Sequence, residues 1–147
     1  MLLADQAGTN MHDQYQKLYR DFHWQVPEHF NIAQVCCERW ARDPGRTAIL
    51  YEDTGGATAR WTYRDLHLAA NRLANALRAL GVRRGNRVAI IVPQRPETAI
   101  AHIALYRLGA VAMPMSMLFG PEALSYRFAD SGAVADPSAG SILRGFL

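Results

Sequence analysis

Histidine is the side chain best suited to proton transfer and metal binding near neutral pH, and this sequence contains five. No two of them stand four residues apart with a glutamate between, the spacing with which one helix face binds zinc. His67 lies near the polar boundary of a long amphipathic stretch, and His102 lies in an apolar one. Functional histidines usually have a charged partner nearby, so we expect both to be structural. The others are His12, His23 and His29.

The two cysteines and the serines lack the context that catalysis requires. Cys36 and Cys37 are adjacent, and adjacent cysteines rarely bridge each other because the link strains the backbone. No second cysteine pair suggests zinc. We therefore expect reduced thiols and a cytoplasmic protein. Ser116 and Ser125 lack the G-x-S-x-G signature of a serine nucleophile.

Two loops are candidates for ligand binding. "GVRRGN" at 81–86 stands between a predicted helix and a predicted strand, whereas a phosphate cradle needs the reverse order. No nucleotide-binding glycine motif is present, and Lys17 is the only lysine, so this loop is a turn. "PQRPE" at 93–97 follows a predicted parallel strand, where open α/β sheets bind ligands. Gln94 and Arg95 are therefore candidate ligand-binding residues; the alternative is a rigid turn that begins the next helix.

The composition is that of a globular domain. Of the 147 residues, 50% are hydrophobic, and the net charge is only +3. The arginines are scattered rather than gathered in a stripe with aromatic residues, which argues against nucleic-acid binding. The apolar runs are too short to span a bilayer, and the first residues lack a basic start and apolar core, so we expect neither a membrane span nor a secretory signal.

The N-terminal part of the chain predicts a flexible start and two helices. Residues 1–14 lack a pattern that would order them. An amphipathic helix over 15–24 would place an apolar face on a larger body, and a second helix over 30–45 would begin at Asn31. The first face comprises Leu18, Tyr19 and Phe22. The second comprises Ile32, Val35, Cys36 and Trp40.

A hairpin and a long helix follow. Residues 47–53 and 58–63 are rich in β-formers and flank Gly55-Gly56, which predicts a β-hairpin. Thr62 and Asp65 have the spacing of a capping box, and Gly81 ends the helix that they begin. Its predicted inner face comprises Leu66, Ala69, Ala70, Leu73, Ala76, Leu77 and Leu80.

The next segments predict a parallel βαβ unit. An apolar strand at 87–93, a helix that begins at Pro96 and ends at Gly109, and a strand at 110–115 follow one another with short joins. A third helix runs from Pro121 to Gly132. The predicted fold class is α/β, an incomplete parallel βαβ sheet with flanking helices and an N-terminal hairpin. "AVADPSAGSILRGFL", from Ala133, has no strand core, so we expect 134–147 to be a divergent tail of a truncated or frameshifted product.

These segments resemble a known family. "TYRDL" (62–66), "ANRLA" (70–74), "GV" (81–82) and "GNRVAI" (85–90) resemble the first core motif of the AMP-forming acyl-CoA synthetases, in the adenylate-forming AMP-dependent synthetase/ligase superfamily. Asn86 stands where that motif usually has aspartate. Residues 105–133 resemble the second core motif, and 30–50 the N-terminal helix and strand. "AVAMPMSM" (110–117) is most similar to the acetate and medium-chain acyl-CoA ligases.

The resemblance implies that residues 15–133 form part of the N-terminal domain of a ligase. Such an enzyme activates a short- or medium-chain fatty acid with Mg-ATP to an acyl-adenylate and transfers the acyl group to coenzyme A. The family's phosphate loop and catalytic lysine come later than the segments matched here, so no catalytic, cofactor-binding or metal residue is assigned. ATP, magnesium and coenzyme A are expected for the full-length enzyme only, and the chain alone is expected to be inactive.

Two alternatives remain open. The chain could be a non-catalytic remnant that pairs with a full-length ligase or with the missing portion through its unpaired sheet edge. It could also be a small nucleotide- or coenzyme-A-binding domain. Whichever hypothesis holds, a parallel sheet without its neighbours leaves apolar strands partly uncovered, so we expect poor solubility or a dye-binding, loosely packed state when the chain is expressed alone.

Overall fold

The computed structural model describes residues 11–133, which divide into two compact units at Phe30. The first unit contains helix α1 (Met11–Asp21), which begins earlier and ends sooner than the predicted helix at 15–24. The packing of its apolar face on a larger body stays a prediction, since α1 belongs to the first unit alone. Leu18 and Tyr19 are 70% and 73% exposed, and Phe22 is also exposed. The predictions for residues 1–10 and 134–147 lie outside the described part of the chain.

The second unit begins with the predicted helical segment, which is irregular. Asn31 Oδ1 accepts hydrogen bonds from the backbone N–H groups of Ala33 (2.9 Å) and Gln34 (3.4 Å), so its capping role is confirmed. A π-helical turn, η1 (Gln34–Glu38), and a 3₁₀ turn, η2 (Trp40–Arg42), follow. The predicted inner face is wrong by one position. Ala33 and Cys37 are buried, while Ile32 and Cys36 are exposed.

The shift has a physical reason. The segment packs against the long helix that follows the hairpin, and the small side chains Ala33 and Cys37 allow a close approach. Hydrophobicity at α-helical spacing favoured the neighbouring stripe with the larger Ile32. The wider π turn changes which residues share a face, so the observed inner face is different.

The predicted hairpin is confirmed. Strands β1 (Thr47–Glu52) and β2 (Thr58–Thr62) pair antiparallel, with Tyr51 opposite Ala59. Asp53 Oδ1 closes the turn by accepting hydrogen bonds from the N–H groups of Gly55 (2.8 Å) and Ala57 (2.9 Å).

Helix α2 (Tyr63–Ala79) begins at the predicted capping box. Asp65 N donates to Thr62 Oγ1 (3.1 Å), and Thr62 N donates to Asp65 Oδ2 (2.9 Å). The predicted inner face is correct in part. Leu66, Ala70 and Leu73 of that face are buried, whereas Leu80, the C-cap residue, is exposed. Ala74, which was not predicted to face inward, is also buried.

The parallel βαβ unit is confirmed. Strands β3 (Arg87–Ile90) and β4 (Val111–Pro114) pair in parallel on either side of helix α3 (Pro96–Leu108). Helix α3 has Pro96 in its first turn, as predicted. Strand β3 is shorter than the predicted 87–93 because its pairing with β4 ends at Ile90 and Pro114, and no other strand of the described chain continues it.

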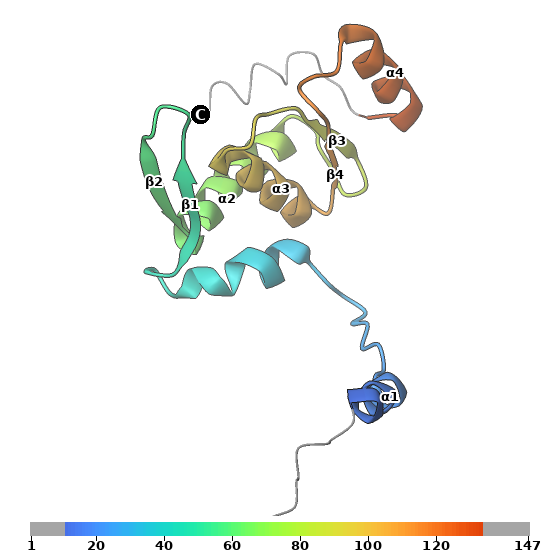
Figure 1. The fold of residues 1–147 in the computed structure, drawn as a ribbon. Helices are drawn as coiled ribbons and strands as arrows, with labels where there is room; N and C mark the ends of the chain where they lie inside the picture. The colour runs from blue at the N-terminus through green and yellow to red at the C-terminus, as the bar shows by residue number, and fades with distance from the viewer. Residues whose placement is uncertain (1–10, 134–147) are drawn as a thin grey trace, which may run out of the picture. The chain divides into compact units, whose positions relative to one another are not determined.

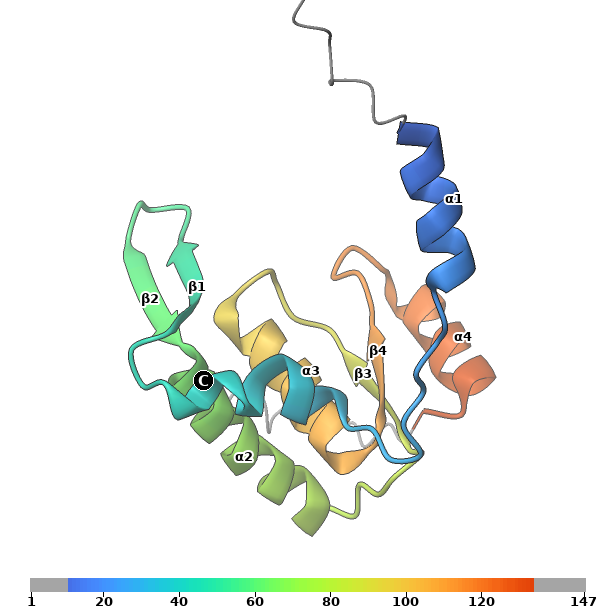
Figure 2. The ribbon, with the colours of Figure 1, turned by 90° about the horizontal axis from the view of Figure 1, so that it is seen from below.

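Helix α4 (Pro121–Ser131) completes the described chain and ends at Gly132, as predicted. Figures 1 and 2 show α2 and α3 on one side of the β3–β4 pair and α4 on the other. None of the residues of α4 is buried. The predicted fold class, α/β with a parallel βαβ unit, flanking helices and an N-terminal hairpin, is confirmed.

The core lies between the β3–β4 pair, α2, α3 and η1. It is built mainly from small and aliphatic side chains, and Leu105 and Cys37 are the largest fully buried ones among the described residues. The buried members are Cys37, Leu66, Ala70, Leu73, Ala74, Val82, Ile90, Ile100, Ala101, Ala104, Leu105 and Ala110.

Candidate functional site

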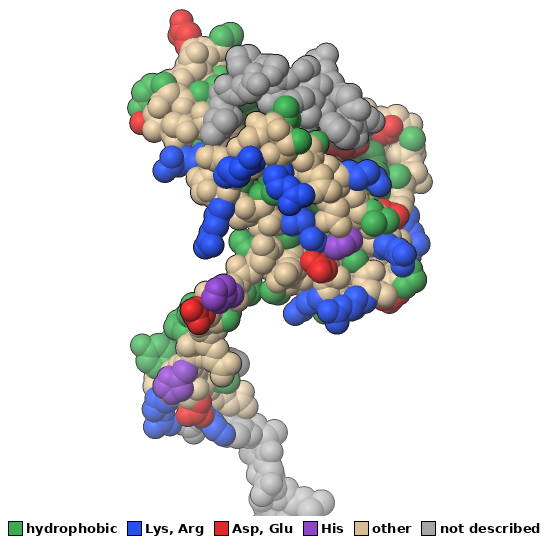
Figure 3. Space-filling view, turned by 180° about the vertical axis from the view of Figure 1, so that it is seen from behind, with side chains coloured by type: hydrophobic (Ala, Val, Ile, Leu, Met, Phe, Trp, Pro, Cys, Tyr) green, Lys and Arg blue, Asp and Glu red, His purple; other side chains and the backbone are tan. Residues whose placement is uncertain are grey.

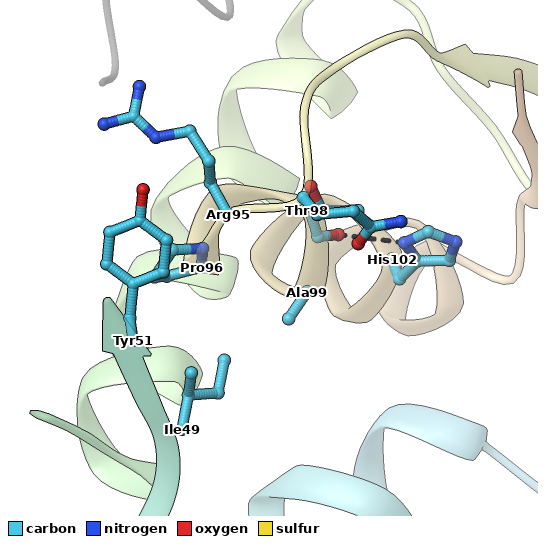
Figure 4. Close-up of a pocket in the computed structure, with 8 residues that line it drawn as sticks. Ile49, Tyr51, Arg95, Pro96, Thr98, Ala99 and His102 are labelled. Carbon is cyan, nitrogen blue, oxygen red and sulfur yellow. Dashed lines mark hydrogen bonds between the residues drawn. The ribbon is translucent and has the colours of Figure 1, made fainter. Parts of the chain in front are cut away.

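A pocket of about 360 Å³ lies between strand β1 and the N-terminal half of α3 (Figure 4). The two candidates from the sequence, Gln94 and Arg95, both line it. The hairpin contributes Ile49 and Tyr51, whose place in this pocket the sequence did not predict, because it depends on a non-local approach of β1 to α3. The remaining lining residues are Pro96, Thr98, Ala99 and His102, all from α3.

The loop that holds Gln94 and Arg95 is fixed by local hydrogen bonds. Thr98 Oγ1 donates to the Pro93 carbonyl at 2.7 Å, and Thr98 N donates to the Arg95 carbonyl at 3.0 Å. Pro96 is buried and its fixed φ suits the first helical turn. The alternative interpretation of "PQRPE" as a rigid turn is therefore correct in geometry, and the same turn places two polar side chains at the pocket.

Among the described residues that line this pocket, Arg95 is the one with a permanent charge. Its Nε lies 3.9 Å from Oε2 of Glu97, and its side chain is 53% exposed. Glu97 Oε2 is buried without a hydrogen-bond partner among the described residues. The carboxylate therefore offsets part of the positive charge, and the exposed half of Arg95 remains available to a polar or anionic group.

His102 is held by its own helix. Its Nδ1 lies 2.8 Å from the Thr98 carbonyl, drawn as a dashed line in Figure 4. A carbonyl oxygen only accepts, so Nδ1 carries a proton and donates it. The ring also packs at a tilt against Tyr106, with centroids 5.9 Å apart. The structural role expected of His102 stays a prediction.

His67 belongs to a polar network that joins η1, α2 and α3. Arg107 Nη2 donates to Glu38 Oε2 at 2.8 Å and lies 3.2 Å from His67 Nδ1. Asn71 Nδ2 lies 3.0 Å from His67 Nε2, while Asn71 Oδ1 is buried without a partner. A guanidinium only donates, so Nδ1 must accept and Nε2 must carry the proton. Turning the Asn71 amide over would give that proton an acceptor and satisfy Oδ1.

The sequence did not single out Glu38 or Arg107. They lie 69 residues apart, and no local pattern links them. The network joins three elements and does not reach the pocket at β1 and α3. The structural role expected of His67 stays a prediction.

The two cysteines have different surroundings. Cys36 is exposed and Cys37 is buried, and both are free thiols. Burial raises the pKa of the Cys37 thiol, against the opposing effect of Arg107. Cys37 Sγ lies 3.7 Å from the Tyr63 carbonyl. A buried thiol with a raised pKa is a poor nucleophile, which argues against a catalytic role for Cys37.

The described residues lack other features that would indicate a reaction or a membrane. Between residues 11 and 133, no three acidic, histidine or cysteine side chains gather to bind a metal ion. None of the described helices is long and apolar enough to cross a bilayer. Figure 3 shows basic side chains in several separate groups on one face. The expectation that nucleic acid is not a partner stays a prediction.

The fold and the pocket define a partial α/β domain with a βαβ unit, a hairpin and a ligand-accessible turn after β3. The family of AMP-binding enzymes matches residues 37–135, so this chain belongs to that family. The acetyl-coenzyme A synthetase of Halorhodospira halophila is 44% identical over 105 residues, 70% of this chain. The 3-hydroxypropionyl-coenzyme A synthetase of Sulfurisphaera tokodaii is 46% identical over 88 residues, 60% of this chain.

The solved structures agree. The acyl-CoA synthetase of Brucella canis matches 81% of this chain with a TM-score of 0.73 and 26% identity. The suspected similarity to the N-terminal portion of AMP-forming acyl-CoA synthetases is thereby confirmed.

The chain spans only a small share of each relative. It covers 16% of the Halorhodospira protein, 13% of the Sulfurisphaera protein and 23% of the Brucella chain. The expectation that no residue of this chain is catalytic, cofactor-binding or metal-ligating stays a prediction. The division of the chain into segments 1–14, 15–133 and 134–147 also stays a prediction.

Proposed function

We propose that this chain is the scaffold-bearing portion of a ligase that joins a carboxylic acid to coenzyme A. In the first step a carboxylate oxygen attacks the α-phosphorus of Mg-ATP, and pyrophosphate leaves. In the second the coenzyme A thiol, losing its proton, attacks the acyl carbon, and AMP leaves. ATP, magnesium and coenzyme A are used by the longer protein, whose residues outside this chain would hold them. Residues 15–133 form the ligase portion and 134–147 a divergent tail.

One observation carries the proposal. The match to acetyl-coenzyme A synthetase extends over 105 residues at 44% identity, and the family match spans the hairpin, α2 and the whole βαβ unit. Identity at that level over so long a segment supports a shared fold and a shared reaction class. The relatives' names support acetate and other short acids; medium-chain fatty acids remain the second candidate from the sequence of residues 110–117.

The chain by itself is proposed to be inactive. ATP-dependent acyl transfer needs cationic groups and a metal ion to offset the charge that develops on phosphate. Lys17, the only lysine, lies on α1 in the first compact unit, and the polar residues of the pocket supply a single half-exposed arginine. A cytoplasmic location remains part of this proposal.

A chimera tests the proposal. Residues 31–133 would replace the matching segment of the Halorhodospira acetyl-coenzyme A synthetase, and pyrophosphate release would be measured with acetate, ATP, magnesium and coenzyme A. We expect turnover by the chimera and none by the 147-residue chain. A soluble chimera with a cooperative melt and no turnover would contradict the shared reaction class, and turnover by the chain alone would contradict the scaffold role.

A further inference from the structure

The outer side of α2 carries a basic stripe. Arg64, Leu68 and Arg72 follow one another at steps of four residues, so they lie along one face of the helix. Both arginines are exposed, and Leu68 between them is 46% exposed. Asp65 is the acidic residue of α2, and its carboxylate accepts hydrogen bonds from Thr62. Neither of the two ion pairs found among the described residues involves the arginines of this stripe.

A hollow of about 350 Å³ lies beside this stripe. The Arg60 guanidinium is fixed at its wall, because Nε donates to Thr47 Oγ1 at 2.8 Å and Nη2 donates to the Gly45 carbonyl. The hollow combines an indole and a leucine side chain with two cations, surroundings that suit an aromatic ring accompanied by negative charge. Its lining residues are Arg60, Trp61, Asp65, Leu68 and Arg72.

Helix α4 has the complementary pattern. Glu122, Tyr126 and Asp130 are also spaced by four residues, and all three are exposed, Tyr126 by 69%. Arg127, the basic residue of α4, is bound to its own helix, since its Nη1 donates to the Ala123 carbonyl at 2.9 Å. The exposed stripe of α4 is therefore acidic, aromatic and acidic, where that of α2 is basic, aliphatic and basic.

The two stripes belong to opposite sides of the molecule. Helix α2 lies on one side of the β3–β4 pair and α4 on the other, as both ribbon views show (Figures 1 and 2). The α4 stripe of one copy can therefore meet the α2 stripe only of another copy. Two α2 stripes, or two α4 stripes, would repel each other. In a dimer with two-fold symmetry the α2–α4 contact would form twice.

We infer that α2 of one copy of this chain docks on α4 of a second copy. Tyr126 enters the hollow beside Leu68, and the two carboxylates that flank Tyr126 face Arg64 and Arg72. Each stripe has the same charge order in both directions, so the helices can pair parallel or antiparallel. Exposed ion pairs are individually weak, so we expect a dissociation constant on the order of 10–100 µM. The inference does not depend on the proposed function, because no step of the ligase reaction enters it.

An exchange of charge between the stripes tests the contact. Sedimentation equilibrium would be run on the full 147-residue chain at low salt. Arg64→Glu/Arg72→Glu makes both stripes of that variant acidic, and Glu122→Arg/Asp130→Arg makes both stripes of the other basic. Each variant alone should therefore repel itself. A mixture of the two restores opposite charges at both α2–α4 contacts.

We expect the wild-type chain and the mixture to associate, and each charge variant alone to associate at least about tenfold more weakly. Tyr126→Ala keeps every charge and should also weaken association at least about tenfold, because the hollow is left unfilled. The matched control, Arg42→Glu/Arg78→Glu, makes the same change of charge at exposed arginines outside the stripe and should behave as the wild type. Salt should weaken the wild-type complex.

Three results would overturn the inference. They are a wild-type chain that stays monomeric at roughly 200 µM, a mixture of folded variants that does not associate, and a control weakened as much as Arg64→Glu/Arg72→Glu. Circular dichroism and melting would establish folding. Where a charge variant fails to fold, a disulfide between copies decides. Leu68→Cys and Tyr126→Cys, each combined with Cys36→Ser, should cross-link when mixed under mild oxidation, and absence of the cross-linked dimer would contradict the contact.

Discussion

Nη2 of Arg107 lies 2.8 Å from Oε2 of Glu38, and this contact ties the C-terminal end of α3 to the irregular helical segment that precedes the hairpin. The same guanidinium also donates to His67 of α2. Three elements that are distant in the sequence are thus joined by one side chain. Because the residues are 29% and 41% exposed, the contact is partly screened by water, and its contribution to stability is modest.

A double-mutant cycle measures this contact. Glu38→Gln, Arg107→Gln and the double variant should give a coupling free energy of about 0.5–1 kcal/mol in urea unfolding. The matched control is the cycle of Arg95→Gln and Glu97→Gln, whose atoms are 3.9 Å apart and should couple by about 0.2 kcal/mol or less. Equal coupling in the two cycles would contradict the role assigned to Arg107.

The capping box of α2 should make stability depend on pH. The Thr62 hydroxyl and, as the second contribution, the Thr62 backbone N–H donate hydrogen bonds to the Asp65 carboxylate. Both lower the pKa of Asp65. A carboxyl with a lower pKa in the folded state stabilises the fold above its unfolded pKa of about 3.9, and this contribution is lost as pH falls through the folded value. The decrease in the free energy of unfolding caused by Asp65→Asn should therefore be largest near neutral pH and should become smaller toward pH 3.

The cap itself is tested at a single pH. Thr62→Ala should lower the free energy of unfolding by about 1 kcal/mol at pH 7, because it removes the acceptor for Asp65 N. Thr62→Ser keeps a hydroxyl and is the control, with an expected change of less than about 0.5 kcal/mol. A loss in the serine variant as large as that in the alanine variant would show that the threonine methyl, and not the cap, is responsible.

Gly109 should be much less replaceable than Gly120. Gly109 has φ +68°, and a Cβ atom there would lie 3.1 Å from Cγ of Arg84. Gly120 has φ −69°, with nothing within 4 Å of an added Cβ. Gly109→Ala should cost about 1–2 kcal/mol in chemical unfolding, whereas Gly120→Ala should be within about 0.5 kcal/mol of wild type. Comparable losses would contradict the left-handed conformation at Gly109.

Much of the fold could be predicted because it is encoded locally. Thr62 and Asp65 are three residues apart, Pro96 begins a helix by its fixed φ, and Gly109 and Gly132 end helices by adopting positive φ. Each of these signals acts within one turn of chain, so a single sequence contains it. The βαβ order followed from the alternation of such bounded segments.

The remaining features depend on contacts that no local pattern encodes. The choice between Cys36 and Cys37 as the inner residue is decided by packing on α2, and the length of β3 by where Pro114 ends its partner. At the pocket, Gln94 and Arg95 could be predicted from their place after a strand. Tyr51 could not, because the approach of the hairpin to α3 is non-local.

The two thiols should react at very different rates. Cys36 is exposed, whereas Cys37 is buried and burial raises its pKa, so little thiolate is accessible there. In the native protein we expect one thiol to react rapidly with a disulfide reagent such as DTNB and the second to react only on unfolding. Cys36→Ser should abolish the rapid phase, and Cys37→Ser should retain it. A rapid phase in Cys36→Ser would contradict the burial of Cys37.

The exposed apolar residues from β4 to α4 should make the isolated chain bind hydrophobic dyes. Leu118 is 94% exposed, Tyr126 is 69% exposed, and no residue of α4 is buried. The largest fully buried side chain among the described residues is only a leucine, Leu105. We expect strong fluorescence with ANS and a broad thermal transition. Leu118→Asp should reduce dye fluorescence with little change in stability, whereas Leu105→Ala should increase it and cost about 2–5 kcal/mol. A sharp melt of a monomer that binds no dye would show that this surface is covered within the chain.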